Sequence, residues 1–468
     1  MPNCQYANFD ITILGTDPPY PVSAQFDGQS AEGAFTEQVD DPFWQEIVAR
    51  FGAVHHPPGS AQIRAAGTRL FDSLIAGDVQ RLWIRAETRI GNGGLRVRLA
   101  IQPPRVAALP WEALFDRDRN RLLAASGRTP LVRMETQSRY LPAPRPLNNR
   151  APLNILVAAA EDPYGEIDVA VQQRALADLF AGLPDDQVRV HQRSGRFSVV
   201  DLAQEVAAND IDLLHLISHG QADSLLLWHN GQPVAVEAGA VSTALERAET
   251  LRLVYLSACL AGQSSARVAF TTVGPQLLQL GIPAVIAMQF AVSDADAMAF
   301  ADMFYRELLT GPCPGAVDAA MGYARSSLYA LNPDAFSFGT PVLWLNAPDG
   351  VVFQLAAPPA QDATPTSAPV PPPAEPAAPV ALPSEQELLA WLQTWTTRVE
   401  AVPLPPQWRL TWPREVDHFL GLVRQLPHTS NPAQKLEEIQ TAQIRLRNMA
   451  EQILAPPHDP PPTVDDAA

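Results

Sequence analysis

The chain has 468 residues, which is enough for about three domains of about 150 residues each. Hydrophobic residues make up 47% of it and charged residues 18%, so it can bury a sizeable core. The net charge is −17, which argues against a nucleic-acid partner, and no apolar run reaches the ~18 residues of a membrane span. These values predict an acidic, water-soluble globular protein.

Residues 1–141 mix two kinds of hydrophobic pattern. Strand-like alternation and helical spacing both occur there, the first at 9–15 and 94–102 and the second at 43–51 and 60–76. We expect an N-terminal α+β region that packs on the domain after it and carries no obvious chemistry. Three prolines between Pro142 and Pro146 end this region.

Residues 150–355 alternate buried strands with amphipathic helices. Strands that are apolar on both faces, separated by helices, indicate a parallel sheet covered on both sides. We therefore predict an α/β fold, a parallel-sheet αβα sandwich whose ligand chemistry gathers at the carboxyl ends of the strands. The predicted strands are 153–160, 188–193, 211–218, 251–258, 283–289 and 340–346, and the predicted helices are 169–183, 199–208, 241–249, 273–281, 293–311 and 315–331.

A proline-rich segment follows this domain. Ten of the 26 residues from Pro358 to Pro383 are proline, which removes backbone donors and favours an extended chain. We therefore expect 356–383 to be a semi-rigid linker.

A small helical module is predicted at 384–455. Ser384 and Glu387 form a capping box in front of a run with helical spacing. Trp391 and Trp395 lie four residues apart, so they form the core of the module or, alternatively, a surface for a partner. The last residues, 456–468, read as a disordered tail.

The three cysteines, Cys4, Cys259 and Cys313, lie far apart in the sequence. They are too few and too scattered for a disulfide framework or a cysteine zinc site. The first ten residues do not resemble a secretory signal, so we expect a reducing, cytoplasmic location. No glycine-rich phosphate loop and no HExxH zinc helix occurs, so no metal or other cofactor is expected.

Two of the predicted strands end in reactive side chains. One strand ends at His219 followed by Gly220, and another ends at Cys259. If the two strands are neighbours, their ends lie ~5 Å apart. His219 could then take the proton of the Cys259 thiol, while Gly220 would let a substrate carbonyl approach backbone N–H groups. This combination is typical of cysteine nucleophilic catalysis.

These motifs resemble the caspase-like cysteine peptidases and, within them, the CHAT domain family. The resemblance covers about residues 60–350 and leaves the helical module outside. It rests first on the His-Gly and Ser-Ala-Cys strand ends, and further on Leu109-Pro110-Trp111-Glu112, Pro130-Leu131-Val132-Arg133, Gly281-Ile282-Pro283-Ala284-Val285, Val292-Ser293-Asp294 and Phe304-Tyr305 with Leu308.

The resemblance implies a cysteine endopeptidase in which His219 is the base and Cys259 the nucleophile. The oxyanion hole would map onto the backbone N–H groups of Gly220 and Cys259. Relatives that cut after a basic residue place a carboxylate in the specificity pocket, which points to Asp294, with Asp296 as the second choice. Ser293 and Asp296 also fit a cap for the helix that begins there.

Other polar residues have weaker claims. Glu161 and Asp162 follow the first strand of the domain, where Asp162 could reach the substrate pocket, although a solvated loop is the alternative. His215 and Ser257 are expected to be structural, and Cys313 to be inert in a turn. Trp111 is expected to be a packing residue and Glu112 to pair with a basic group.

Three functions compete at this stage. The first is a cysteine endopeptidase that cleaves a protein partner and is regulated through the helical module, in a setting that the resemblance suggests to be bacterial stress or antiphage defence. The second is a catalytically silent scaffold that recruits proteins. The third is a cysteine hydrolase or acyltransferase on a small substrate, because a strand-end thiol and base do not dictate a peptide bond.

Overall fold

The computed structural model describes residues 6–51, 58–91, 93–135, 142–147, 151–164, 167–183, 186–221, 224–259, 273–355 and 385–400, with single residues between 416 and 450. The chain divides into two compact units, Met1–Ala363 and Thr364–Ala468. The expected linker at 356–383 and tail at 456–468 lie outside the described residues. None of the described helices is both long enough and apolar enough to cross a membrane.

The first unit is built on one sheet, in which the described strands follow the order β12-β11-β10-β13-β14-β15-β7-β4-β1-β2-β3, while β8 pairs with β10 and carries β9 at its other edge. The strands are β1 (Tyr6–Ile13), β2 (Tyr20–Phe26), β3 (Gln29–Phe35), β4 (Gly94–Ile101), β7 (Leu131–Met134), β8 (Leu153–Ala160), β9 (Val188–Gly195), β10 (Leu213–Gln221), β11 (Ser224–His229), β12 (Gln232–Glu237), β13 (Leu253–Cys259), β14 (Ala284–Met288) and β15 (Pro341–Leu345). A separate hairpin joins β5 (Phe115–Asp116) to β6 (Arg121–Leu122).

The centre of the sheet is the run β9-β8-β10-β13-β14, and all of its neighbouring strands are parallel. All eight residues of β8 are buried, as expected of a strand whose two faces are both covered. Alternate residues contribute to two different hydrophobic clusters: Val157 faces one cluster and Leu156 the other. The predicted α/β fold with a parallel sheet is confirmed.

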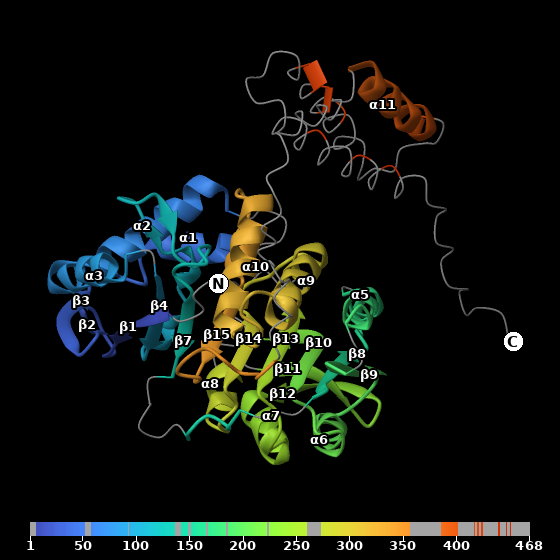
Figure 1. Ribbon diagram of the computed structural model, residues 1–468, viewed down its shortest axis with the longest axis horizontal. Helices are drawn as coiled ribbons and strands as arrows, with labels where there is room; N and C mark the ends of the chain where they lie inside the picture. The colour runs from blue at the N-terminus through green and yellow to red at the C-terminus, as the bar shows by residue number, and fades with distance from the viewer. Residues whose placement is uncertain are drawn as a thin grey trace, which may run out of the picture. The chain divides into compact units, whose positions relative to one another are not determined.

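Helices cover both faces of this central sheet, with α5, α9 and α10 on one side and α6, α7 and α8 on the other (Figure 1). They are α5 (Val169–Ala181), α6 (Val199–Ala208), α7 (Ala238–Ala244), α8 (Val273–Leu278), α9 (Asp294–Thr310) and α10 (Val317–Leu331), with short 3₁₀ turns η3 (Leu245–Arg247) and η4 (Ser337–Gly339). The three-layer arrangement leaves the ends of the strands as the exposed route to the sheet.

The N-terminal part of the chain extends the same sheet. Strand β7 pairs with β15 on one side and with β4 on the other, in parallel. Helices α1 (Pro42–Phe51), α2 (Ser60–Leu74) and α3 (Gly77–Ile90) supply apolar residues to the core beside these strands, and a short helix α4 (Pro104–Ala107) and a 3₁₀ turn η1 (Trp111–Ala113) follow β4. The described residues of 1–141 therefore share a hydrophobic core with the domain after them.

A buried ionic cluster links the N-terminal part to the central sheet. Glu112 accepts hydrogen bonds from both Arg133 Nε (3.0 Å) and Arg133 Nη2 (2.7 Å), and Arg325 Nη2 lies 3.8 Å from the same carboxylate. Glu112 and Arg325 are both fully buried, and burial lowers the pKa of Arg325 to about 10. Gln289, which follows β14, accepts from Arg133 and donates to the Ala108 carbonyl. The expectation that Glu112 pairs with a basic group is confirmed.

Replacing Glu112 by glutamine is expected to lower the free energy of unfolding by about 3–5 kcal/mol, because two buried guanidinium groups lose the charge that compensates them. Urea denaturation followed by circular dichroism measures the change. Asp302→Asn is the matched control, since Asp302 pairs with Arg306 at the surface and such pairs contribute at most about 1 kcal/mol. Equal losses in the two variants would contradict the role assigned to the cluster.

The proline-rich segment at Pro142–Pro146 lies against the amino ends of β13 and β14. The backbone N–H of Arg145 donates to the Gly281 carbonyl. The guanidinium of Arg145 donates to the Leu251 carbonyl at 2.9 Å and to the Leu280 carbonyl at 3.2 Å. Burial lowers the pKa of this guanidinium. The segment is therefore attached to the central sheet at one end of its strands, opposite to the ends that carry His219 and Cys259.

The second unit contains one fully described helix, α11 (Glu385–Glu400). Leu388, Leu392 and Val399 are buried in a cluster that also includes Phe419 and Val423. Trp391 and Trp395 pack beside this cluster, with their ring centroids 6.5 Å apart. The helical pattern at 388–399 thus forms a helix with its own apolar core, while most of 401–455 lies outside the described residues.

Candidate active site

His219 and Cys259 lie opposite each other at the carboxyl ends of β10 and β13. The two strands are parallel, and their register pairs His219 with Cys259. Neighbouring strands lie about 4.8 Å apart, so the backbone places the two residues side by side. The side chain of Cys259 lies outside the described residues, whereas that of His219 is described and only 6% exposed.

A carboxylate holds the imidazole of His219. Nε2 of His219 lies 2.6 Å from Oδ1 of Asp162, and both side chains are almost fully buried. A hydrogen bond from Nε2 to this carboxylate leaves Nδ1 as the nitrogen that can accept a proton.

The loop after β8 sets the position of Asp162. Its Oδ1 accepts from the backbone N–H of Tyr164 at 2.7 Å, and its Oδ2 accepts from the N–H of Ile167 at 2.7 Å. Short polar side chains commonly organise turns in this way. The sequence ranked Asp162 as a pocket residue, and its contacts favour a role in orienting His219. Sequence reasoning missed this role because it does not show that β8 lies next to β10.

Asp294 begins helix α9 and faces the start of α5. Its Oδ1 accepts from Gln172 Nε2 at 3.0 Å, and its Oδ2 accepts from the backbone N–H of Asp168 at 3.3 Å. Oε1 of the same Gln172 accepts from the hydroxyl of Ser257 at 3.4 Å. Because Ser257 lies two residues before Cys259 on β13, the structure places Asp294 one side chain away from the strand that carries the thiol.

Asp296 lies in a neighbouring cavity of about 160 Å³. The cavity is lined by Phe51, Val292 and Phe336 among other residues, and Asp296 Oδ2 accepts from the Ser337 hydroxyl at 2.6 Å. The backbone N–H of Asp296 also donates to Ser293 Oγ. The expected helix cap by Ser293 is therefore confirmed.

Below the strand ends lies a layer of buried aromatic and polar rings. His215 stacks on Tyr255 with ring centroids 4.4 Å apart, and its Nδ1 lies 2.7 Å from the hydroxyl of Tyr305. Burial alone lowers the pKa of His215 to about 3, so this histidine stays neutral at physiological pH. The expectation that His215 is structural is confirmed by its complete burial.

The buried His215 is expected to make stability depend on pH. Because its pKa falls from 6.5 to about 3 on folding, the unfolded chain takes up a proton that the folded chain does not, and stability falls as the pH drops below about 6.5. Between pH 6.5 and 5 the loss is roughly 2 kcal/mol.

Urea unfolding at pH 6.5 and at pH 5 measures this loss of stability. His215→Phe should be less stable at pH 7 but show a smaller loss on acidification, whereas His229→Gln, at an exposed position, should keep the loss of the original protein. An unchanged pH dependence in His215→Phe would contradict the assignment.

Glu161 has surface partners. Its carboxylate pairs with Arg196 at 2.8 Å, and its backbone carbonyl accepts from the indole of Trp228 at 2.9 Å. Arg196 in turn lies over the Trp228 ring. The solvated-loop interpretation therefore suits Glu161, although it does not suit Asp162.

Cys313 corrects one expectation from the sequence. It lies in the turn between α9 and α10 and forms a disulfide, although the cysteines were expected to be too few and too scattered for a disulfide framework. Separation along the chain does not prevent contact in the fold.

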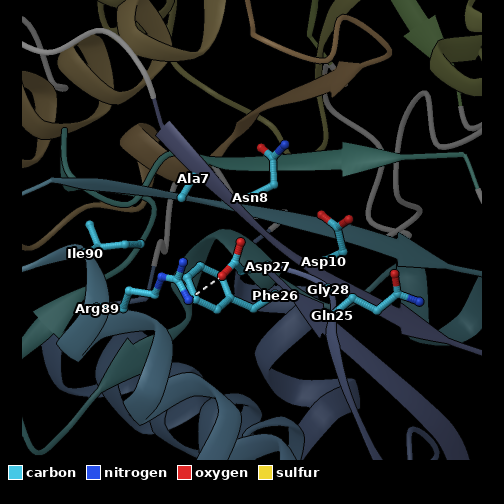
Figure 2. A pocket seen from close by; sticks show the side chains of 9 residues that line it. All are labelled: Ala7, Asn8, Asp10, Gln25, Phe26, Asp27, Gly28, Arg89 and Ile90. Atoms are coloured by element: carbon cyan, nitrogen blue, oxygen red, sulfur yellow. Dashed lines mark ion pairs between the residues drawn. The ribbon is translucent and has the colours of Figure 1, made fainter.

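A hollow of about 480 Å³ lies elsewhere in the first unit (Figure 2). Its lining includes Asn8, Asp10 and Gln25, and an ion pair joins Arg89 to Asp27. These residues come from β1, β2 and the ends of neighbouring elements, and β1 lies five strands away from β13. At about 4.8 Å a strand, this hollow is separate from His219. Among the described residues, histidine, cysteine and carboxylate side chains do not gather into a group that could hold a metal ion.

Comparison with solved structures finds distant similarities. The crystal structure of the Arg-specific cysteine proteinase gingipain R aligns with a TM-score of 0.42 at 13% identity, over 61% of this chain and 70% of that one. The complex of Porphyromonas gingivalis RgpB pro- and mature domains gives 0.41 at 14% identity, over 63% and 76%. The Saccharomyces cerevisiae separase–securin complex gives 0.34 at 16% identity, over 58% of this chain and 17% of that one.

A search of curated proteins found no match. The model of one protein family does match, and its description is the CHAT domain. The match runs over residues 64–355, which is more than half of the chain and includes β7, the central sheet, His219 and Cys259. It confirms the family inferred from the two strand ends: the chain belongs to the CHAT domain family.

Proposed function

We propose that this protein is a cysteine endopeptidase in which His219 is the base and Cys259 the nucleophile. The observation that carries the proposal is the register that pairs these two residues at the carboxyl ends of β10 and β13. The contact of 2.6 Å between His219 and Asp162 supports it, because a nucleophile, a base and a group that orients the base form the usual arrangement in covalent catalysis.

Cys259, His219 and Asp162 together account for the bond and proton changes of peptide hydrolysis. His219 Nδ1 takes the proton of Cys259, and the thiolate attacks the carbonyl carbon of the scissile bond. The C–N bond then breaks, and the leaving nitrogen takes the proton from the imidazolium. Water next gives a proton to His219, and the hydroxide attacks the thioester, which breaks the S–C bond and releases the acid, whose proton passes to solvent. The imidazolium then returns its proton to the Cys259 thiolate. Asp162 keeps the ring oriented and compensates its charge in both halves of the reaction.

The negative oxygen of the tetrahedral intermediate needs donors of its own. We assign this role to the backbone N–H groups of Gly220 and Cys259, as part of the same proposal. Both residues lie at the strand ends, next to His219, and Gly220 has no side chain to block the approach of a substrate carbonyl.

Selection of a basic residue before the cleaved bond is assigned to Asp294, with Asp296 as the second choice. The link from Asp294 through Gln172 to Ser257 supports the choice. Asp294→Asn is expected to lower kcat/KM for peptides with arginine at this position by about tenfold or more, while peptides with a neutral residue there change little. Turnover of the arginine peptides that stays unchanged in this variant would contradict the assignment.

Regulation through the C-terminal helical module and a setting in bacterial defence are the finer parts of the proposal. The module has a hydrophobic core distinct from that of the first unit, so it can serve as a separate binding element for a protein partner. A tethered module raises the effective concentration of whatever it captures.

Fluorogenic peptides with arginine, lysine, aspartate or leucine before the cleaved bond test the proposed function. We expect cleavage by the full chain and none by Cys259→Ala, a variant that retains the folded sheet. If no peptide is cleaved and the Cys259 thiol reacts no faster than a free thiol, the peptidase proposal fails and the silent scaffold is favoured.

A further inference from the structure

Tyr164 is the aromatic side chain that lies directly against the imidazole of His219. The two rings meet edge to face, with centroids 5.3 Å apart and planes at 73°. Although it touches a buried residue, Tyr164 is itself 60% exposed. A substrate bound beside His219 would cover part of this exposed ring, and burial of aromatic surface is favourable.

The loop that carries Tyr164 is fixed by the same carboxylate that holds His219. Oδ1 of Asp162 accepts from the backbone N–H of Tyr164 at 2.7 Å and from His219 Nε2 at 2.6 Å. The backbone of Tyr164 and the imidazole of His219 are therefore both hydrogen-bonded to Oδ1 of Asp162. The ring is held beside the base by backbone geometry, which is the condition for a surface that selects between substrates.

The reaction itself tells which half of the substrate lies beside Tyr164. When the C–N bond breaks, the leaving nitrogen receives a proton from His219 and must lie about 3 Å from the ring nitrogen. The side chain next to that nitrogen belongs to the first residue of the leaving fragment. With the Tyr164 ring packed on the imidazole, this side chain would come close to the exposed face of Tyr164.

The order of the strands agrees with this assignment. Tyr164 follows β8, which pairs with one edge of β10, while Cys259 lies on β13 at the other edge. The acyl half of the substrate becomes bonded to the Cys259 sulfur, on the β13 side. The amine half therefore extends from His219 toward β8 and its loop.

Charge decides the kind of side chain that fits. A basic side chain beside Tyr164 would be repelled by the imidazolium of His219. An acidic side chain would be repelled by the carboxylate of Asp162, whose Oδ1 lies 2.6 Å from His219 Nε2. A large apolar or aromatic side chain avoids both costs and covers the exposed ring.

We propose that Tyr164 is a specificity-determining residue, which selects a large apolar or aromatic side chain on the first residue of the leaving fragment. The inference rests on the proposed peptidase function and adds a substrate preference on the side of the cleaved bond opposite to Asp294.

Internally quenched peptides that differ only at this residue test the proposal, with phenylalanine, leucine, glycine or lysine after the cleaved bond. The full chain should prefer phenylalanine to glycine by about tenfold in kcat/KM. Tyr164→Ala should reduce this ratio to about twofold, and Tyr164→Phe, which keeps the ring, should retain it. Tyr323→Ala is the matched control, because Tyr323 is 47% exposed on α10.

Four results would overturn the proposal. The first is a ratio that Tyr164→Ala leaves unchanged. The second is an equal fall of kcat for all four peptides, which would make Tyr164 a positioning residue for His219. In the third, the full chain cleaves none of the peptides and iodoacetamide modifies its Cys259 no faster than it modifies a free thiol, so that the peptidase proposal fails as well. Cleavage by the full chain without any preference overturns the Tyr164 assignment alone.

Discussion

In the His219→Ala variant, peptide cleavage is expected to fall by on the order of 10⁴-fold, because the same imidazole activates the thiol and protonates the leaving nitrogen. Substrate binding does not need the imidazole, so KM should change much less than kcat. Reaction of Cys259 with iodoacetamide at pH 7 should slow by about tenfold, since an isolated thiol with a pKa of ~8.5 is mostly protonated there. Mass spectrometry of the modified peptide gives this rate without any knowledge of the substrate.

His215→Phe serves as the control for this experiment, because His215 lies four residues earlier on the same strand and is fully buried against Tyr305. It should leave the alkylation rate of Cys259 close to that of the original protein. An alkylation rate that is the same with and without the His219 imidazole would show that the residue is not the base of Cys259.

Asp162→Asn is expected to lower kcat by between about 10²- and 10³-fold. The amide of asparagine is neutral, so it no longer stabilises the imidazolium, and it can turn its NH₂ group toward the ring and favour the wrong tautomer. The loss of charge should also raise the pH at which Cys259 alkylation reaches half of its maximal rate, by about one unit. The rate of Cys259 alkylation, measured from quenched samples over about pH 4–9, gives this shift.

Glu161→Gln is the neighbouring control, since Glu161 precedes Asp162 in the same loop but pairs with Arg196 at the surface. Its pH profile should match that of the original protein. If Asp162→Asn lowers the stability of the fold but leaves the alkylation profile in place, Asp162 stabilises the loop and does not act on His219.

The adjacency of His219 and Cys259 was predictable from the sequence because its signals are local. Each residue ends a strand that is recognisable by its apolar run, and parallel strands bring their carboxyl ends to one edge. The observed register adds that His219 and Cys259 are direct neighbours. The helix cap by Ser293 was predictable for the same reason, since the cap and its partner are three residues apart.

Roles that depend on long-range contacts were not predictable in this way. Asp162 and Asp294 look alike in the sequence, as acidic residues that follow strands. Only the order of the strands shows that the loop after β8 reaches His219, whereas Asp294 turns toward Gln172 on α5. The disulfide of Cys313 was missed for the same reason.

The seven consecutive residue pairs between β10 and β13 have a consequence for how such an enzyme could be silenced. Sliding one strand by a single residue would turn its whole set of buried side chains to the opposite layer, so base and nucleophile cannot be drawn apart without unravelling the middle of the protein. We therefore expect silencing of the proposed peptidase to act on its side chains or on the loops around the strand ends, while the register of β10 and β13 is kept.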